Sequence, residues 1–183
     1  MAHTFKELTS FIQSIGAAEL QHTGDKNYLA HLVAVHNDLK KMGCEEDVCR
    51  AGLFHSIYGT ERFQRFTLPL EQREEVRSLI GERAERLAYW NCCVDRASLD
   101  QAVAQGEQTF VDRITGERIE ASEKDFLDLI TIHLCDWLEQ IERSGVWDYR
   151  REGYRDMAEL LSGRWWEAYE ETYRREKKSE KVG

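Results

Sequence analysis

Hydrophobic positions recur every three or four residues through most of the chain, which is the spacing of amphipathic helices. The first segment with this spacing begins after Thr4, a favourable capping residue, and ends at Gly16. A second segment covers about 27–42, and a third covers about 45–55. The first third of the chain is therefore predicted to form three helices.

The stretch that follows, Y-G-T-E-R-F-Q-R-F-T-L-P, is irregular and rich in aromatic and basic residues. Such a composition between helices is typical of the rim of a pocket. Charged helical segments are predicted next, at about 70–80 and 82–94. Ser98 is expected to cap a short helix that ends at Gly106.

One segment, T-F-V-D-R-I-T-G-E-R-I-E-A at 109–121, alternates with the period of a strand and contains a Thr-Gly turn, so it predicts a small hairpin. Ser122 with Asp125 then predicts the start of a long helix, over 122–142. Its apolar residues lie nearly all round, which marks a central buried helix. Two further amphipathic segments follow, and 175–183 is expected to be a frayed end.

These elements predict a mostly α-helical fold, a single domain over 1–183 with one small β-hairpin inserted before the long helix. The 183 residues are 42% hydrophobic and 32% charged, as in an ordinary globular domain. A formal charge of −9 argues against a general nucleic-acid or membrane surface, but it does not exclude a local basic pocket for a small anion. Because no stretch of the sequence has the pattern of a signal peptide or a membrane span, we expect a cytoplasmic protein.

Five cysteines without C-x-x-C spacing predict reduced core residues rather than a disulfide framework or a zinc site. Near the C-terminus, the paired tryptophans at 165–166 and the tyrosines at 169 and 173 share a helical face. That face has two interpretations, core packing or the contact of a homodimer.

Three polar residues stand among apolar neighbours on predicted helices: His31, His55 and Asp136. Burying such groups without partners costs several kcal/mol, so each is expected to have one. Taken singly, each residue has a simple structural interpretation as a hydrogen-bonded core side chain. Taken together, they are candidates for one pocket, because an imidazole at the end of an apolar helix commonly reaches a pocket wall.

At these places, Y-L-A-H-L-V-A-V-H, A-G-L-F-H-S-I-Y-G-T and L-I-T-I-H-L-C-D-W-L-E-Q, the chain resembles the HD-domain superfamily of metal-dependent phosphohydrolases over about 28–140. The resemblance is greatest to an uncharacterised HD-related group with H-S-x-Y-G-T in place of His-Asp. It implies an HD-like helical bundle in which His31, His55 and Asp136 are metal ligands. Ser56 stands where the family has the Asp of its His-Asp pair.

The resemblance further implies a mononuclear site, because no histidine lies between His55 and His133 to serve a second ion. Two imidazoles and one carboxylate suit Mn, Fe, Co or Zn as the divalent ion. Glu61 and Arg62 are then candidate catalytic residues, Glu61 to take a proton from water and Arg62 to hold an anionic group. Candidate substrate-binding residues are Tyr58, Lys26, Arg65 and Arg96. The alternative is that the loop residues are solvated charges. His133, three residues before Asp136, is a candidate spare ligand or hydrogen-bond partner, but the preferred interpretation of it is structural.

The first hypothesis is a metal-dependent hydrolase of a small anionic, phosphorylated molecule, the substrate class being implied by the resemblance. The second is a non-catalytic protein that keeps the pocket for a small ligand, which Ser56 favours because a neutral hydroxyl is a weak metal ligand. The third is a mononuclear iron oxygenase with the same three ligands.

Overall fold

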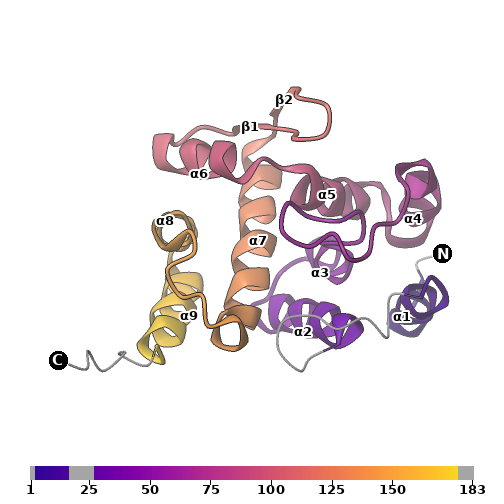
Figure 1. The fold of residues 1–183 in the computed structure, drawn as a ribbon, viewed down its shortest axis with the longest axis horizontal. Helices are drawn as coiled ribbons and strands as arrows, with labels where there is room; N and C mark the ends of the chain where they lie inside the picture. Colours follow the sequence, from indigo (N-terminus) through magenta and orange to yellow (C-terminus); the bar gives the residue numbers. More distant parts are fainter. Residues whose placement is uncertain (1–2, 17–26, 177–183) are drawn as a thin grey trace.

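One long helix, α7 (Glu123–Ser144), runs through the middle of the computed structural model, which describes residues 3–16 and 27–176 (Figure 1). The helices before it are α1 (Phe5–Ser14), α2 (Tyr28–Lys41), α3 (Glu46–Leu53), the 3-10 turn η1 (Leu70–Gln72), α4 (Arg73–Ile80), α5 (Glu82–Cys93) and α6 (Arg96–Gln105). The elements that complete the fold are β1 (Thr109–Val111), β2 (Arg118–Glu120), α8 (Arg151–Leu161) and α9 (Gly163–Arg174).

Helices from both halves of the chain pack around α7. Helices α2, α3 and α5 contact it from one side, and α8 and α9 from the other (Figure 1). Apolar side chains of α7 are buried nearly all round the helix, including Leu129, Ile132, Leu134 and Cys135. A helix that is apolar all round is stable only when neighbours cover it completely, which explains its central position.

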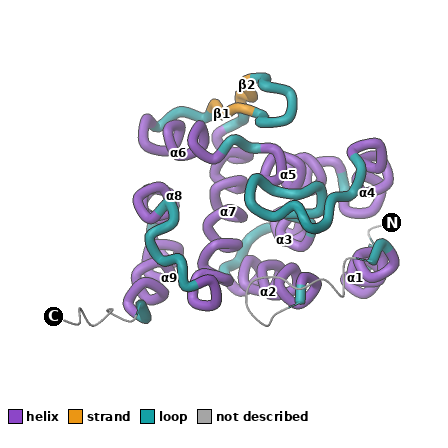
Figure 2. Tube along the Cα trace, in the orientation of Figure 1, coloured by secondary structure: helices purple, strands orange, loops and turns teal. Residues whose placement is uncertain are grey.

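The predicted hairpin is present at one end of α7 (Figure 2). Its two strands are antiparallel, with Phe110 opposite Ile119, and Gly116 in the turn has a φ of +75°. Glycine adopts this left-handed conformation without steric cost. The prediction of a mostly α-helical fold with one small hairpin before the long helix is confirmed.

Two of the three predicted N-terminal caps are present. The side chains of Thr4 and Ser122 each accept a hydrogen bond from a backbone N–H in the first turn of α1 and α7. Asn27, which was not predicted as a cap, does the same for α2. The prediction for α6 was wrong. Its cap is Asp95, which accepts from the N–H of Ser98, while the Ser98 hydroxyl accepts from the N–H of Val111 in β1.

Helices α2 and α3 approach each other closely at Gly52. A Cβ at this position would overlap Cδ1 of Leu39 on α2, and Leu39 is fully buried. The absence of a side chain at Gly52 therefore lets the end of α3 lie against α2. This contact brings the turn that carries His55 towards His31.

All five cysteines are free thiols, and four of them are buried, as predicted. Tyr169 is buried, and the indole N–H of Trp137 on α7 donates to the hydroxyl of Tyr173, so the aromatic face of α9 packs on the core. None of the described helices combines the length and apolar character needed to cross a membrane. Lys26 and most of the predicted frayed end, 177–183, lie outside the described residues.

Candidate metal centre and pocket

The three polar residues singled out in the sequence meet in the interior. Nε2 of His31 lies 3.0 Å from Oδ1 of Asp136, and Nε2 of His55 lies 3.2 Å from the same oxygen. The two Nε2 atoms are 3.3 Å apart. Residues from α2, the turn after α3, and α7 thus form a triangle of donor atoms, which we call the triad.

The other nitrogen of each imidazole fixes the orientation and the tautomer of the ring. Nδ1 of His31 lies 2.5 Å from a carboxylate oxygen of Glu139, and Nδ1 of His55 lies 2.8 Å from the carbonyl oxygen of Gly52. Both oxygens are acceptors, so both Nδ1 atoms carry a proton. In the neutral rings the Nε2 lone pairs then point at each other and at Asp136.

Three lone-pair donors this close together repel one another unless a cation lies between them. In proteins that hold a divalent ion, each histidine ligand commonly donates its second N–H to a carboxylate or a backbone carbonyl. His31 and His55 show both versions of this arrangement. A proton is the alternative cation, and it requires one ring to become an imidazolium.

The pKa shifts of the triad residues agree with the need for a positive charge between the three donor atoms. Burial lowers the pKa of His31, but the hydrogen bonds to Asp136 and Glu139 outweigh burial, and its pKa is raised. Burial raises the pKa of Asp136, but the two facing imidazoles outweigh it, and its pKa is well below the usual range. The triad therefore keeps an ionised carboxylate and attracts positive charge.

Neighbours on α7 and α2 complete the surroundings of the triad. Glu139 is in turn held by the guanidinium of Arg143, and the side-chain amide of Gln140 donates to Oδ1 of Asp136 at 2.7 Å. The hydroxyl of Ser56 lies 2.9 Å from that of Tyr28. Ser56 thus adds no negative charge, as expected from the sequence.

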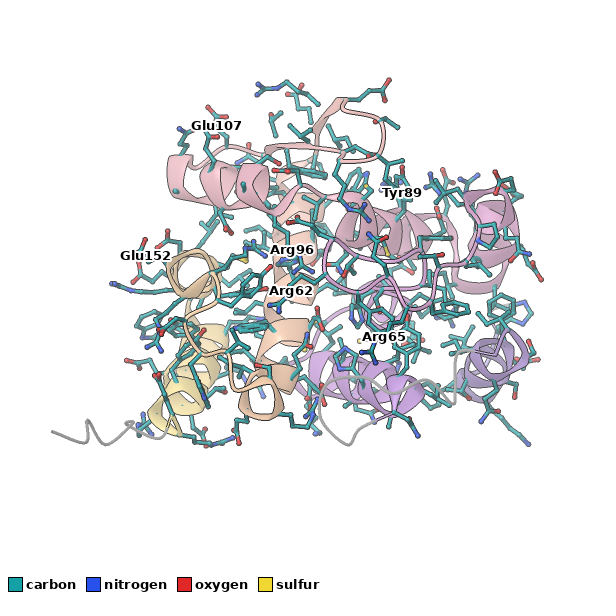
Figure 3. All side chains as sticks on the ribbon, viewed as in Figure 1. Arg62, Arg65, Tyr89, Arg96, Glu107 and Glu152 are labelled. Carbon is teal, nitrogen blue, oxygen red and sulfur yellow. The ribbon has the colours of Figure 1, made fainter. Side chains whose placement is uncertain are left out.

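A pocket of about 270 Å³ opens onto the triad. His55, Ser56 and Asp136 line it together with Arg62, Arg96 and Trp137. Figure 3 shows Arg62 and Arg96 beside each other in front of α7, and both contact Tyr149 in the connection between α7 and α8. Two of the arginines predicted from the sequence therefore reach one pocket.

The remaining predicted residues lie elsewhere. Tyr58 is not among the residues that line the pocket, because its hydroxyl donates to the buried carboxylate of Glu85, which also binds Arg73. Glu61 accepts the backbone N–H of Arg96 at the start of α6, so its charge stabilises a helix N-terminus. Arg65 is exposed and outside the pocket.

His133 has the structural role that was preferred for it from the sequence. Its Nδ1 donates to the side-chain oxygen of Asn91, and its Nε2 accepts from Arg150. The amide of Asn91 donates to the backbone carbonyl of His55. Arg150, His133 and Asn91 thus form a buried chain of hydrogen bonds that supports the backbone of a triad residue.

Comparison with known proteins gives one family. The chain is similar to a domain of unknown function, DUF6817, whose family model matches residues 11–96. The matched part is less than half of the chain and contains His31 and His55, while Asp136 lies outside it. No curated protein and no solved structure matches the chain.

Proposed function

We propose that the protein is a hydrolase of small anionic molecules that uses one divalent metal ion bound by His31, His55 and Asp136. The observation that carries the proposal is the orientation of the two imidazoles. Each is anchored through Nδ1–H, so that both Nε2 lone pairs face the Asp136 carboxylate. The resemblance to HD-domain proteins supports the same assignment.

The donor atoms fit a divalent ion. With metal–ligand bonds of about 2.0–2.1 Å in tetrahedral or octahedral geometry, neighbouring donors lie about 2.8–3.4 Å apart. The observed separations of 3.0, 3.2 and 3.3 Å fall in that interval. Two nitrogens and one oxygen suit Zn, Fe(II), Co or Mn. A divalent ion supplies Lewis acidity and lowers the pKa of a bound water.

The residues around the triad position its side chains and enclose the substrate. Glu139 and the carbonyl of Gly52 hold the two imidazole rings, and Gln140 holds the carboxylate of Asp136. The pocket admits a small molecule next to His55 and Asp136, between Trp137 and the two arginines. Among the described residues that line the pocket, Asp136 is the one carboxylate, so Glu61 has a structural role instead of a catalytic one. Arg62 lines the pocket and remains a candidate to bind the substrate.

Ser56 supports a second candidate function, a non-catalytic protein that binds a small ligand in the same pocket. Its hydroxyl faces Tyr28 and supplies no charge at the position where HD proteins have an aspartate. A third candidate is an iron oxygenase, because two histidines and one carboxylate also form the site of such enzymes. Metal content and the requirement for oxygen separate the three candidates.

The decisive experiment is elemental analysis of protein purified without a metal-affinity tag, comparing the wild type with His55→Ala. The control is His36→Ala, which removes another buried histidine that packs on Phe5, away from the triad. We expect about one equivalent of metal in the wild type and the control and almost none in His55→Ala.

Activity is then measured against phosphate esters, with and without oxygen. Turnover that needs the metal but not oxygen supports the hydrolase. Turnover that stops without oxygen supports the oxygenase. Absence of metal from the wild type, even after incubation with Mn(II), Fe(II) or Zn(II), would overturn the hydrolase and leave the ligand-binding protein.

A further inference from the structure

Arg96 is a buried cation without an ion pair. The residue is 7% exposed, and among the described residues no carboxylate lies within ion-pair distance of its guanidinium. Its side chain makes one hydrogen bond, from Nη1 to the hydroxyl of Tyr149 at 2.8 Å. Burying a charge without a counterion is costly, so the free energy of folding would improve if an anion joined it.

A neighbouring arginine, Arg150, differs from Arg96 because its charge is neutralised by an ion pair. Arg150, at the start of α8, forms an ion pair with Asp100 and donates to His133. Arg150 does not line the pocket at the triad, whereas Arg96 does. Of these two cations, the one that faces the pocket is thus the one without an ion pair.

Arg62 adds a second positive charge at the same place. Its guanidinium carbon lies 4.1 Å from the centre of the Tyr149 ring, and no described carboxylate pairs with it. Tyr149 therefore holds both arginines, Arg62 on its ring face and Arg96 at its hydroxyl. The guanidinium fork is suited to bidentate binding of phosphate or carboxylate oxygens.

We propose that Arg62, Tyr149 and Arg96 form an oxyanion subsite that binds the anionic group of the substrate without the help of a metal ion. The inference rests on the proposed function in treating this anion as part of the substrate. The arginines supply two positive charges, so the matching group is a dianion. A phosphate monoester, with a charge of about −1.5 to −2 at neutral pH, fits better than a single carboxylate.

The size of the pocket restricts the rest of the substrate. Pockets for drug-sized ligands are roughly 300–1,000 Å³. The pocket here is about 270 Å³, and both arginines of the subsite line it together with His55 and Asp136 of the triad. The substrate class is therefore a small phosphorylated metabolite rather than a polymer end.

The test uses protein stripped of metal with a chelator and titrated with inorganic phosphate in a calorimeter, with acetate as the monoanion for comparison. The matched pair of variants is Arg62→Gln and Arg65→Gln. Both remove an arginine from the same loop, but Arg65 lies outside the pocket. Arg96→Gln is the third variant, and circular dichroism verifies that each variant is folded.

We expect phosphate to bind the wild type at least tenfold more tightly than acetate. Arg62→Gln and Arg96→Gln should each weaken phosphate binding by roughly tenfold or more, since each loses a charge-assisted interaction. Arg65→Gln should stay within about twofold of the wild type. If Arg96→Gln does not fold, the comparison of Arg62→Gln with Arg65→Gln still decides.

Three results would overturn the subsite: no phosphate binding by the wild type, equal binding of acetate and phosphate, or equal effects of Arg62→Gln and Arg65→Gln. His55→Ala distinguishes this failure from that of the metal site. It should lose metal but keep metal-free phosphate binding. Phosphate binding in a wild type that takes up no metal would retain the subsite and reject the metal hydrolase.

Discussion

The Nε2 atoms of His31 and His55 lie 3.3 Å apart, although the two residues are 24 positions apart in the chain and belong to different elements. Hydrogen bonds at Nδ1 hold both rings in this orientation: His31 is bonded to Glu139, and His55 is bonded to the carbonyl of Gly52. The positions of the three donor atoms therefore depend on partners outside the triad, and a metal ion would depend on the same partners.

Glu139→Gln should lower the affinity for the metal by about 10- to 100-fold, the usual effect of losing a partner of a histidine ligand. The amide accepts the same hydrogen bond without the negative charge that strengthens the imidazole as a donor. Competition with a coloured chelator measures the affinity. The control is Glu142→Gln on the same helix, where the lost partner is the exposed Arg175. Equal affinities of wild type and Glu139→Gln would contradict the orientation argument.

Ser56→Asp should restore the carboxylate that HD proteins have at this position. Without metal, a second buried carboxylate in the pocket with Asp136 should lower the free energy of unfolding by roughly 1–3 kcal/mol. With metal, the extra ligand should raise the affinity, so the metal should increase the Tm of Ser56→Asp more than that of the wild type. Ser56→Asn controls for size, and a metal-induced shift in Tm no larger than that of Ser56→Asn would count against the site.

The sequence was sufficient for the elements and for the three residues of the triad. Helical spacing and capping residues predict α1, α2 and α7, and a strand period in one short segment predicts the hairpin. His31, His55 and Asp136 stand out because each is a polar residue on an apolar face. A side chain that must be buried and must also find a partner leaves few arrangements open.

Hydrogen-bond and stacking partners that are distant in the chain could not be predicted from the sequence, because tertiary packing brings them together. Tyr58 lies three residues after His55, yet its hydroxyl meets Glu85, 27 residues later in the chain. Tyr149 contacts both arginines of the pocket, but it lies in a connection where the hydrophobic residues have no regular spacing. Glu139 was open to prediction, because a residue three positions after Asp136 on a helix lies on the same face.

Tyr58→Phe tests this difference between sequence and structure. In the structure the hydroxyl serves a buried carboxylate, so its loss should lower the free energy of unfolding by about 1–3 kcal/mol. Metal content and phosphate affinity should match the wild type, because Tyr58 does not line the pocket. Urea denaturation and calorimetry provide the two measurements. A loss of phosphate binding at unchanged stability would restore the role in substrate binding that the sequence suggested.

His133 should make the stability of the protein fall in mild acid. Burial and the nearby Arg150 and Arg96 hold its pKa well below that of a free histidine. Below about pH 6.5 the unfolded chain binds a proton at this residue and the folded protein does not, so the free energy of unfolding decreases as the pH falls. The decrease is at most about 1.4 kcal/mol per pH unit.

The measurement is the free energy of unfolding from urea titrations between about pH 7 and pH 5, for the wild type and His133→Gln. Gln can also bond to Asn91 and Arg150 but does not titrate, so the difference in slope isolates His133. His36, whose pKa is also lowered, by its burial above all, is present in both proteins and cancels. The wild type should lose stability faster than the variant as the pH falls. Parallel curves would mean that His133 takes up a proton in the folded protein at the same pH as in the unfolded chain. The hydrogen bonds from Arg150 to the backbone of His55 would then have different donors and acceptors.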